Sequence, residues 1–254
     1  MKRLDDVLGY GLKIYQDSEF FSFSLDSIIL ANFCSIRLRD KKIVDFCSGN
    51  GIVPLILSKR TRSFITGVEI QLKLQKLAYE SIQYNNLQNQ ISIECMDVKD
   101  FSINHRDEFD LVVCNPPYFK VQDNNYFNLS REKTIARHEV CLTLADLCKS
   151  AFQVLKEHGT FCVVHRSERL MDILIEFRNH HIEPKRIQFF YENIDKPSNI
   201  ILVEGQKMGS VGLKIEKPYI LYHLDGTMTD DYSLLQEEVL KWFKRVTIIQ
   251  LLYI

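Results

Sequence analysis

Along most of its length the sequence alternates continuous apolar runs of strand length with amphipathic stretches of helix length. A strand that forms an unbroken apolar run is buried on both faces, as in a parallel sheet covered by helices on both sides. The pattern therefore predicts an α/β fold with one doubly wound, mostly parallel sheet. The expected strands are Lys42–Phe46, Phe64–Val68, Ile91–Cys95, Phe109–Cys114, Gly159–Val164, Arg186–Phe190 and Asn199–Glu204.

Helical periodicity fills the gaps between these strands. Apolar residues recur every three or four positions, which gives each stretch one face to bury against the sheet. An earlier helix follows Ser24, a residue type common at helix N-caps. The expected helices are Leu25–Phe33, Ile52–Lys59, Leu72–Tyr84, Leu142–Lys156 and Glu168–Arg178.

The alternation stops near Gly205, and this sets the expected organisation of the chain. We expect one domain overall, with an N-terminal cap segment at residues 1–40, a catalytic unit at residues 41–206 and an appendage at residues 207–254. Within the appendage the expected elements are an extended segment at Pro218–Leu224, a turn at Asp225-Gly226 and a helix at Asp230–Phe243, whereas Val246–Ile254 fits no recognisable pattern.

Composition limits the partners and the compartment. The 254 residues carry a net charge of −1, so binding of a nucleic acid would depend on local basic patches. Seven scattered cysteines without a C-x-x-C pair favour free thiols in a reducing compartment. The start MKRLDDVLGYG does not resemble a signal peptide, and the end VTIIQLLYI is too short to span a bilayer. We expect a cytoplasmic protein without a membrane segment. Its oligomeric state does not follow from the sequence, and a monomer is the default expectation.

The first predicted strand runs into a glycine-rich loop, VDFCSGNGIVP, and a helix follows. A strand, a glycine loop and a helix in this order form a nucleotide site at the carboxyl end of an α/β sheet. Gly49 and Gly51 allow positive φ angles and a close approach of the backbone to a ligand. A dinucleotide-binding G-x-G-x-x-G pattern that begins at Gly49 would need a third glycine where this chain has Pro54.

Three acidic residues lie at the ends of successive predicted strands, where they should face one crevice. Asp45 precedes the glycine loop, Glu69 ends the second strand and Asp97 follows the third. A carboxylate after the second strand suits the two hydroxyls of a ribose. One after the third strand can accept a hydrogen bond from an adenine amino group. Together with the loop, these acids indicate a nucleoside-containing cofactor.

The fourth strand leads into DLVVCNPPYFK, in which two prolines stiffen an extended turn. The side-chain oxygen of Asn115 and a neighbouring carbonyl at Pro116-Pro117 are two fixed acceptors, which suit the two hydrogens of an NH2 group. The ring of Tyr118 offers a surface for stacking of a flat base. An amine held in this way needs orientation rather than a prior base, and no metal is required. These residues alone leave open an adenine N6, a guanine N2 and a glutamine amide.

The loop resembles the D-x-G-x-G-x-G methyl-donor site of class I S-adenosylmethionine methyltransferases, with Cys47 at the first glycine position. The N-P-P-Y stretch is similar to the (N/D)-P-P-(Y/F/W) signature of amino-group methyltransferases. The chain up to about Asp231 resembles the bacterial tRNA1(Val) adenine N6-methyltransferase family. The stretches that carry this resemblance are FSFSLDSIILANF, DFCSGNGIVPL, DLVVCNPPYFK, IARHEV and ILVEGQKMG.

This resemblance implies a class I, Rossmann-like fold with an antiparallel late strand. It implies S-adenosylmethionine as the cofactor and adenine-37 of a tRNA, just 3′ of the anticodon, as the target. It also implies that Phe23 and Asp26 cover the methionine end of the cofactor and that Asn115 lies beside it. Basic residues in two segments are the expected contacts to RNA: Arg131, Arg137, His138, Lys241 and Lys244.

Other readings remain open at this point. Related amino methyltransferases act on ribosomal guanine N2, on DNA adenine N6 or on a glutamine of a release factor. The chain leaves little room for the extra domains that DNA and protein-glutamine enzymes usually carry. An RNA-binding module that has lost catalysis is a further alternative, and the intact Asn115-Pro116-Pro117-Tyr118 argues against it. The histidines show no paired spacing with carboxylates that would indicate zinc chemistry.

Overall fold

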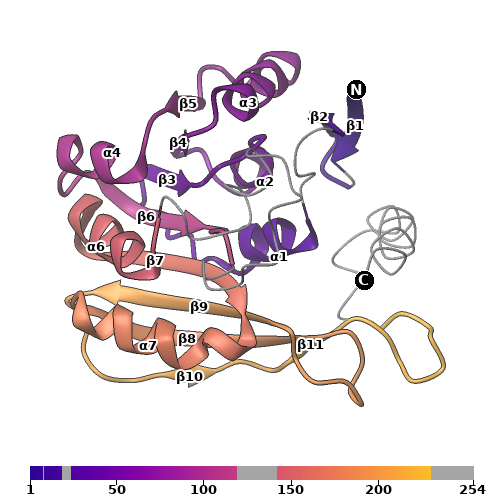
Figure 1. Cartoon of the computed structure of the whole chain (residues 1–254), viewed down its shortest axis with the longest axis vertical. Helices are drawn as coiled ribbons and strands as arrows, with labels where there is room; N and C mark the ends of the chain where they lie inside the picture. Colours follow the sequence, from indigo (N-terminus) through magenta and orange to yellow (C-terminus); the bar gives the residue numbers. More distant parts are fainter. Residues whose placement is uncertain (8, 19–23, 119–141, 230–254) are drawn as a thin grey trace, which may run out of the picture.

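The computed structural model describes residues 1–7, 9–18, 24–118 and 142–229. Its centre is one large sheet with the strand order β10-β8-β9-β7-β6-β3-β4-β5, and β11 also pairs with β8 (Figure 1). The central strands are β3 (Lys42–Phe46), β4 (Phe64–Glu69), β5 (Ile91–Cys95), β6 (Phe109–Cys114), β7 (Leu155–Arg166), β8 (Ile182–Tyr191) and β9 (Ile200–Lys207). All seven predicted strands are confirmed.

The directions of the strands confirm the predicted sheet. Strands β3 to β7 pair in parallel, so their carboxyl ends meet at one edge. Strand β9 runs antiparallel to both β7 and β8, as expected for a late strand in this fold. Strands β4 and β5 lie on one side of β3, and strands β6 and β7 lie on the other, so the chain changes direction across the sheet at β3. Such a switch point opens a crevice outside the carboxyl ends of the strands.

Helices cover both faces of the sheet (Figure 1). On one face lie α1 (Leu25–Phe33), α2 (Ile52–Arg60) and α3 (Leu72–Tyr84), and on the other lie α4 (Val98–Asn104), α6 (Leu144–Val154) and α7 (Leu170–Asn179). In the part of the chain that the structure describes, no helix is both long and apolar enough to cross a membrane.

The two faces of each central strand explain why its sequence is apolar throughout. In β3, Ile43 packs into the cluster under α1 and α2, while its neighbour Val44 packs into the cluster under α4 and α6. Neither side chain is exposed to solvent. Burial of such a side chain contributes roughly 1.5–3 kcal/mol, so both faces of the sheet hold the strand in place.

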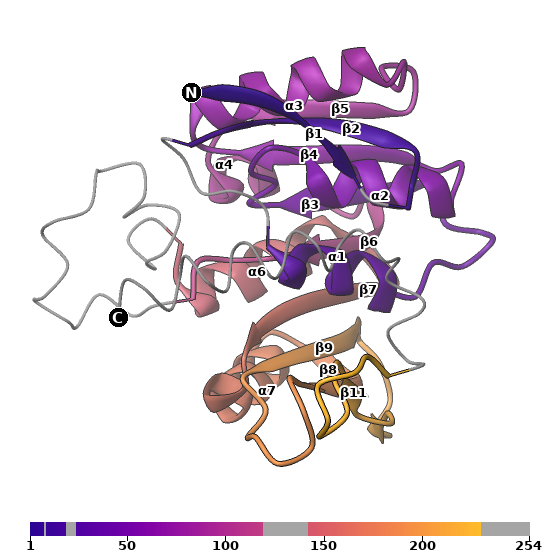
Figure 2. The same ribbon diagram turned by 90° about the vertical axis from the view of Figure 1, so that its right-hand side faces the viewer.

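An N-terminal hairpin was not predicted. Strands β1 (Lys2–Val7) and β2 (Leu12–Asp17) pair antiparallel, and β2 packs along α3 (Figure 2). The backbone N–H of Lys13 donates to Asn85 Oδ1 at 2.9 Å, and that of Tyr15 donates to Ser81 Oγ at 2.9 Å. Each partner lies far along the sequence, so the hairpin depends on α3 for its position.

The C-terminal part partly joins the sheet. The short strands β10 (Lys214–Ile215) and β11 (Tyr219–Ile220) both pair in parallel with β8. The predicted turn at Asp225-Gly226 is confirmed, since Tyr222 and Met228 form an antiparallel bridge around it. The helix expected at Asp230–Phe243 lies outside the described residues, and the division of the chain at residues 40 and 206 stays a prediction.

Candidate active site

The glycine loop lies between β3 and α2, at the carboxyl edge of the sheet. Gly49 and Gly51 have φ angles of 58° and 85°, in the left-handed region where glycine has no steric penalty. A Cβ on Gly51 would lie 3.0 Å from the Cβ of Ala78, whereas one on Gly49 would meet no atom within 4 Å. Gly51 thus lets α2 pack closely on α3, and Gly49 borders open space that a ligand can enter.

Cys47 takes the place of the first glycine in this loop. Its φ angle is 57°, so the cysteine adopts the same left-handed conformation that a glycine would adopt more easily. For a residue with a Cβ this costs about 1–2 kcal/mol, which the surrounding fold must offset. The loop therefore keeps the backbone path of the glycine pattern despite the substitution.

Glu69 ends β4 and fixes the loop from below. Its Oε2 accepts a hydrogen bond from the N–H of Gly49 at 2.8 Å, and its Oε1 accepts one from the N–H of Gln71 at 2.9 Å. Only 5% of the residue is exposed, and this burial raises the pKa of Glu69 above its usual value. The N–H of Ile70 also acts on this carboxylate, which still leaves an acceptor site for a donor from a ligand.

Asp45 lies at the base of the same loop. It is 1% exposed, and within the described part of the chain its Oδ2 makes no hydrogen bond of standard geometry. Burial raises the pKa of Asp45 to about 8; the Ser48 side chain beside it opposes this shift, and the nearby charge of Glu69 adds to it. A buried acceptor without a partner costs about 1–3 kcal/mol, so a cationic or donor group of a ligand would be stabilised here.

Asp97 occupies the predicted place after β5, and it also caps a helix. It is the N-cap of α4, and its Oδ1 accepts a hydrogen bond from the N–H of Lys99 at 2.8 Å. Capping of this kind contributes about 1 kcal/mol to helix stability. The cap accounts for one carboxylate oxygen, and the expected contact of Asp97 to an adenine stays a prediction.

Asn115 follows β6 directly and is held by α1. Its Nδ2 donates to Ser27 Oγ at 2.8 Å, and its Oδ1 accepts a hydrogen bond from the Tyr118 hydroxyl at 2.5 Å. The same hydroxyl lies 2.8 Å from Asp26 Oδ2. Ser27 was not among the predicted residues, although it belongs to the FSFSLDS stretch that was singled out. Together, the Ser27 and Tyr118 hydroxyls hold both ends of the Asn115 amide in place.

The Tyr118 hydroxyl has one proton for two acceptors, so it can donate to only one of them. Burial raises the pKa of Asp26, although the Tyr118 hydroxyl and the charge of Arg166 oppose the shift. A protonated Asp26 can donate to the Tyr118 oxygen, and the tyrosine proton then points to Asn115 Oδ1. Burial likewise raises the pKa of Tyr118 well above its ordinary value, so this group stays a neutral phenol.

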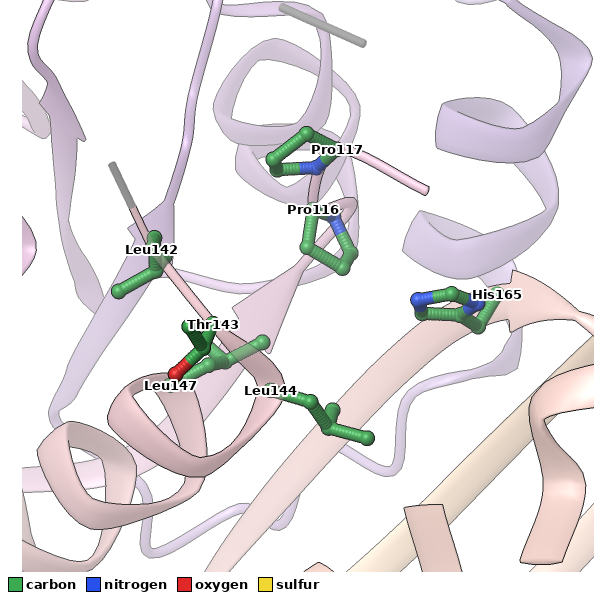
Figure 3. Close-up of a pocket in the computed structure, with 7 residues that line it drawn as sticks. All are labelled: Pro116, Pro117, Leu142, Thr143, Leu144, Leu147 and His165. Atoms are coloured by element: carbon green, nitrogen blue, oxygen red, sulfur yellow. The ribbon is translucent and has the colours of Figure 1, made fainter. Parts of the chain in front are cut away.

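The ring of Tyr118 packs against a histidine that the sequence did not indicate. The ring centroids of Tyr118 and His165 lie 5.2 Å apart at an interplanar angle of 51°. A small, shallow cavity that opens to solvent lies beside His165 (Figure 3). It is lined by Pro116, Pro117, Leu142, Thr143, Leu144, Leu147 and His165.

Part of the predicted site lies outside the described residues. This holds for one expected cofactor contact, Phe23, and for all the predicted basic contacts to RNA: Arg131, Arg137, His138, Lys241 and Lys244. Among the side chains that the structure does describe, no three His, Cys, Asp or Glu residues are grouped so that they could hold a metal ion.

Comparison with known proteins identifies relatives of this chain. The Flavobacterium psychrophilum protein named tRNA1(Val) (adenine(37)-N6)-methyltransferase is 24% identical over 69% of this chain and 75% of its own length. A protein of the same name from Parabacteroides distasonis is also 24% identical, over 75% of this chain and 79% of its own length. The protein of this name from Serratia proteamaculans is 29% identical over 55% of this chain and 53% of its own length.

Solved structures share the fold. A predicted O-methyltransferase from Agrobacterium tumefaciens superposes with a TM-score of 0.65 at 16% identity, over 83% of this chain and 94% of its own. The M. jannaschii TYW2 structure in complex with AdoMet superposes with a TM-score of 0.56 at 14% identity, over 81% of this chain and 85% of its own. The family model described as "Methyltransferase small domain" matches residues 18–189, well over half of the sequence. The chain therefore belongs to the methyltransferase small domain family.

Proposed function

We propose that the protein transfers a methyl group from S-adenosylmethionine to the N6 amino group of an adenine in tRNA, at the position named adenine-37 in tRNA1(Val). The observation that carries the proposal is the position of Asn115. Its side-chain oxygen lies at the carboxyl end of β6, which pairs with the strand that leads into the glycine loop, and Ser27 holds its amide nitrogen. The names of the relatives support adenine and tRNA as the target.

The side chains around the glycine loop fit S-adenosylmethionine. Glu69 can accept a hydrogen bond from a ribose hydroxyl, because its carboxylate has more acceptor sites than the backbone N–H groups of Gly49, Gln71 and Ile70 occupy. Asp45 Oδ2 makes no hydrogen bond of standard geometry within the described structure and suits the ammonium of the methionine part. Gly49 borders open space where the ligand can lie. When bound, S-adenosylmethionine supplies an electrophilic methyl group on a positively charged sulfur.

Asn115 positions the amine that receives this methyl group. The lone pair of an exocyclic amine is delocalised into its ring, so the amine becomes a nucleophile only as it turns pyramidal. Asn115 Oδ1 and the carbonyl of Pro116 hold the two hydrogens and stabilise the charge that develops on nitrogen. Orientation by itself can lower the barrier by several kcal/mol, up to about 7–11 kcal/mol in ideal cases.

Tyr118 has to release Asn115 before the amine can bind. In the present arrangement its hydroxyl donates to Asn115 Oδ1, the acceptor that the amine needs. Asp26 Oδ2, 2.8 Å from the hydroxyl, is an alternative acceptor when the Asp26 carboxyl is ionised. The tyrosine can therefore give up one hydrogen bond and keep the other, and its ring becomes available to stack on the incoming base.

A transfer assay with competing substrates tests the proposal. Purified protein receives labelled S-adenosylmethionine together with tRNA, ribosomal RNA, duplex DNA or a release factor, and the product is digested to nucleosides or amino acids. N6-methyladenosine from tRNA alone is expected. Label that appears only as N2-methylguanosine, only in DNA or only on a glutamine would refute the proposal in favour of one of those alternatives.

The proposed substrate also sets the place of action. A tRNA-modifying enzyme works where its tRNA is, which we propose is the cytoplasm. The net charge of the chain is only −1, so we expect RNA to be bound by a local basic patch and not by the whole surface. The basic residues predicted to contact RNA lie outside the described ranges.

A further inference from the structure

His165 lies near the end of β7, beside the turn that carries Asn115. The sheet register pairs Cys114 of β6 with Val163 of β7, so His165 is level with Pro116, two residues further along each segment. The histidine is 1% exposed. Figure 3 shows its ring extending into the cavity towards Pro116, with the far ring nitrogen leading.

The hydrogen bonding of His165 fixes its tautomer. The backbone N–H of Arg166 donates to Nδ1 at 2.8 Å, so Nδ1 must carry a lone pair. In a neutral imidazole the proton is then on Nε2. Burial, with the charges of Arg169 and Arg166, lowers the pKa of His165 to about 3, and the ring stays neutral at physiological pH. Nε2 is therefore a hydrogen-bond donor.

This donor has no partner within the described ranges of the chain. The structure gives His165 one hydrogen bond, at Nδ1, and one ring contact, with Tyr118. The ring lines the cavity beside the Pro-Pro turn, so an acceptor of a ligand placed there can form a hydrogen bond with this N–H without displacing a protein partner. The histidine lines the same cavity as Pro116 and Pro117, the two residues that follow Asn115.

The atoms next to the amine differ among the candidate substrates. The N6 amine of adenine has the unprotonated N1 as its neighbour on the pairing edge, and this is an acceptor. The N2 amine of guanine has a protonated N1 on that edge, which is a donor and would oppose an N–H group. A glutamine amide carries its carbonyl oxygen on the carbon that bears the amine, and this oxygen is also an acceptor. A donor at this place therefore favours adenine over the pairing edge of guanine, whereas a glutamine amide is distinguished only by its lack of a ring.

We propose that His165 Nε2–H donates a hydrogen bond to N1 of the adenine whose N6 amine is held by Asn115, and that this contact favours adenine over guanine. The inference rests on the proposed function. It makes His165 a residue that touches the substrate. A purely structural role, in which the ring only supports Tyr118 and the Arg166 backbone, would not depend on the chemistry of the base.

The test replaces single atoms on both sides of the contact. The RNA is an anticodon stem-loop of the methylated tRNA with adenosine, 1-deazaadenosine or 7-deazaadenosine at the target position. The proteins are the wild type, His165→Phe, which keeps a ring without the donor, and His165→Gln, which keeps an N–H at similar reach. Rates of N6 methylation give kcat/KM for each pair, and thermal melting checks that each variant is folded.

With the wild type, 1-deazaadenosine is expected to lower kcat/KM roughly 10-fold, as loss of one buried hydrogen bond does, while 7-deazaadenosine has little effect. With His165→Phe, adenosine should be methylated as slowly as 1-deazaadenosine is by the wild type, and the two RNAs should react alike. His165→Gln should restore part of the preference. Such a cycle isolates the pairwise interaction.

Two results would overturn the inference. Equal losses from 1-deazaadenosine with the wild type and with His165→Phe would show that the histidine does not contact N1. Dependence on N7 in place of N1 would do the same. Both results require a wild-type enzyme that methylates adenosine. A wild type that leaves RNA adenosine unmodified would instead overturn the proposed function, and the inference with it. The wild-type comparison of the three RNAs needs no variant, so misfolding cannot obscure it.

Discussion

The contact between Ser27 and Asn115 gives the sharpest prediction. In Ser27→Ala the Nδ2 of Asn115 loses its acceptor at 2.8 Å, in a place where Ser27 is only 6% exposed and little water can replace it. Loss of one such hydrogen bond costs about 0.5–1.5 kcal/mol. The amide is also free to turn over, which presents an N–H instead of an oxygen to the incoming amine. We therefore expect kcat to fall roughly 3- to 10-fold, since 1.4 kcal/mol corresponds to a factor of ten.

The assay separates this effect from a general loss of stability. Single-turnover methylation of tRNA reports on the chemical step, and calorimetric titration reports on the affinity for S-adenosylmethionine, which should stay within about 2-fold of wild type. Ser102→Ala is the matched control: Ser102 is 1% exposed and donates to the Lys99 carbonyl, away from Asn115. Equal loss of turnover in both variants, or an unchanged rate in Ser27→Ala, would refute the orienting role of Ser27.

Three further predictions concern the neighbouring side chains. Tyr118→Phe removes the hydroxyl that donates to Asn115 Oδ1, so KM for tRNA should fall or stay equal. Tyr118→Ala should lower kcat/KM about 10-fold or more, because the stacking surface is lost. Steady-state kinetics measure both effects. Glu69→Gln should weaken binding of S-adenosylmethionine by roughly 10-fold and lower the melting temperature, because the new NH2 group would face a backbone N–H in place of an oxygen; titration and calorimetry measure the two effects. Because the folded pKa of Asp45 is raised to about 8, the folded protein holds this proton more tightly than the unfolded chain. Its contribution to stability is present below about pH 4 and is lost as pH rises towards about 8. Melting of the ligand-free protein across that range should show this loss in the wild type and less of it in Asp45→Asn.

The buried framework could be predicted closely because its signal is local. Strands β3, β5 and β6 and helix α3 begin and end at the predicted residues, since each is an apolar run or an amphipathic stretch with polar flanks. Where two elements adjoin without a turn, the predicted boundary between them was wrong. The predicted helix Leu142–Lys156 ends at Val154, and the chain passes directly into β7.

Elements that depend on distant partners were missed. Strand β2 alternates buried and half-buried residues over only six positions, and it is held by Asn85 and Ser81 of α3. Helix α4 is a short segment capped by Asp97, whereas the sequence pattern indicated Asp97 only as an acid at the end of a strand. Neither the partner nor the cap is visible in the local pattern.

The candidate site divides in the same way. Asp45, Glu69 and Asn115 follow or end apolar strands, so their common edge follows from topology. Ser27 and His165 differ, because each matters through a contact made across the fold. Ser27 looks like an ordinary residue of an apolar helix, and His165 ends a buried strand without any motif. The position of α1 brings Ser27 to Asn115, and the position of β7 brings His165 to Tyr118 and the Pro-Pro turn.

The central claim is that Asn115 acts on the amine and not on the cofactor. The most direct measurement compares Asn115→Ala with the wild type for two quantities, the rate of N6-methyladenosine formation in tRNA and the dissociation constant of S-adenosylmethionine. Asn115→Ala is expected to lose turnover roughly 10²–10³-fold, as for removal of one preorganised polar group. Its dissociation constant for S-adenosylmethionine should stay within about 3-fold of wild type. A collapse of cofactor binding, or turnover close to that of the wild type, would contradict the central claim.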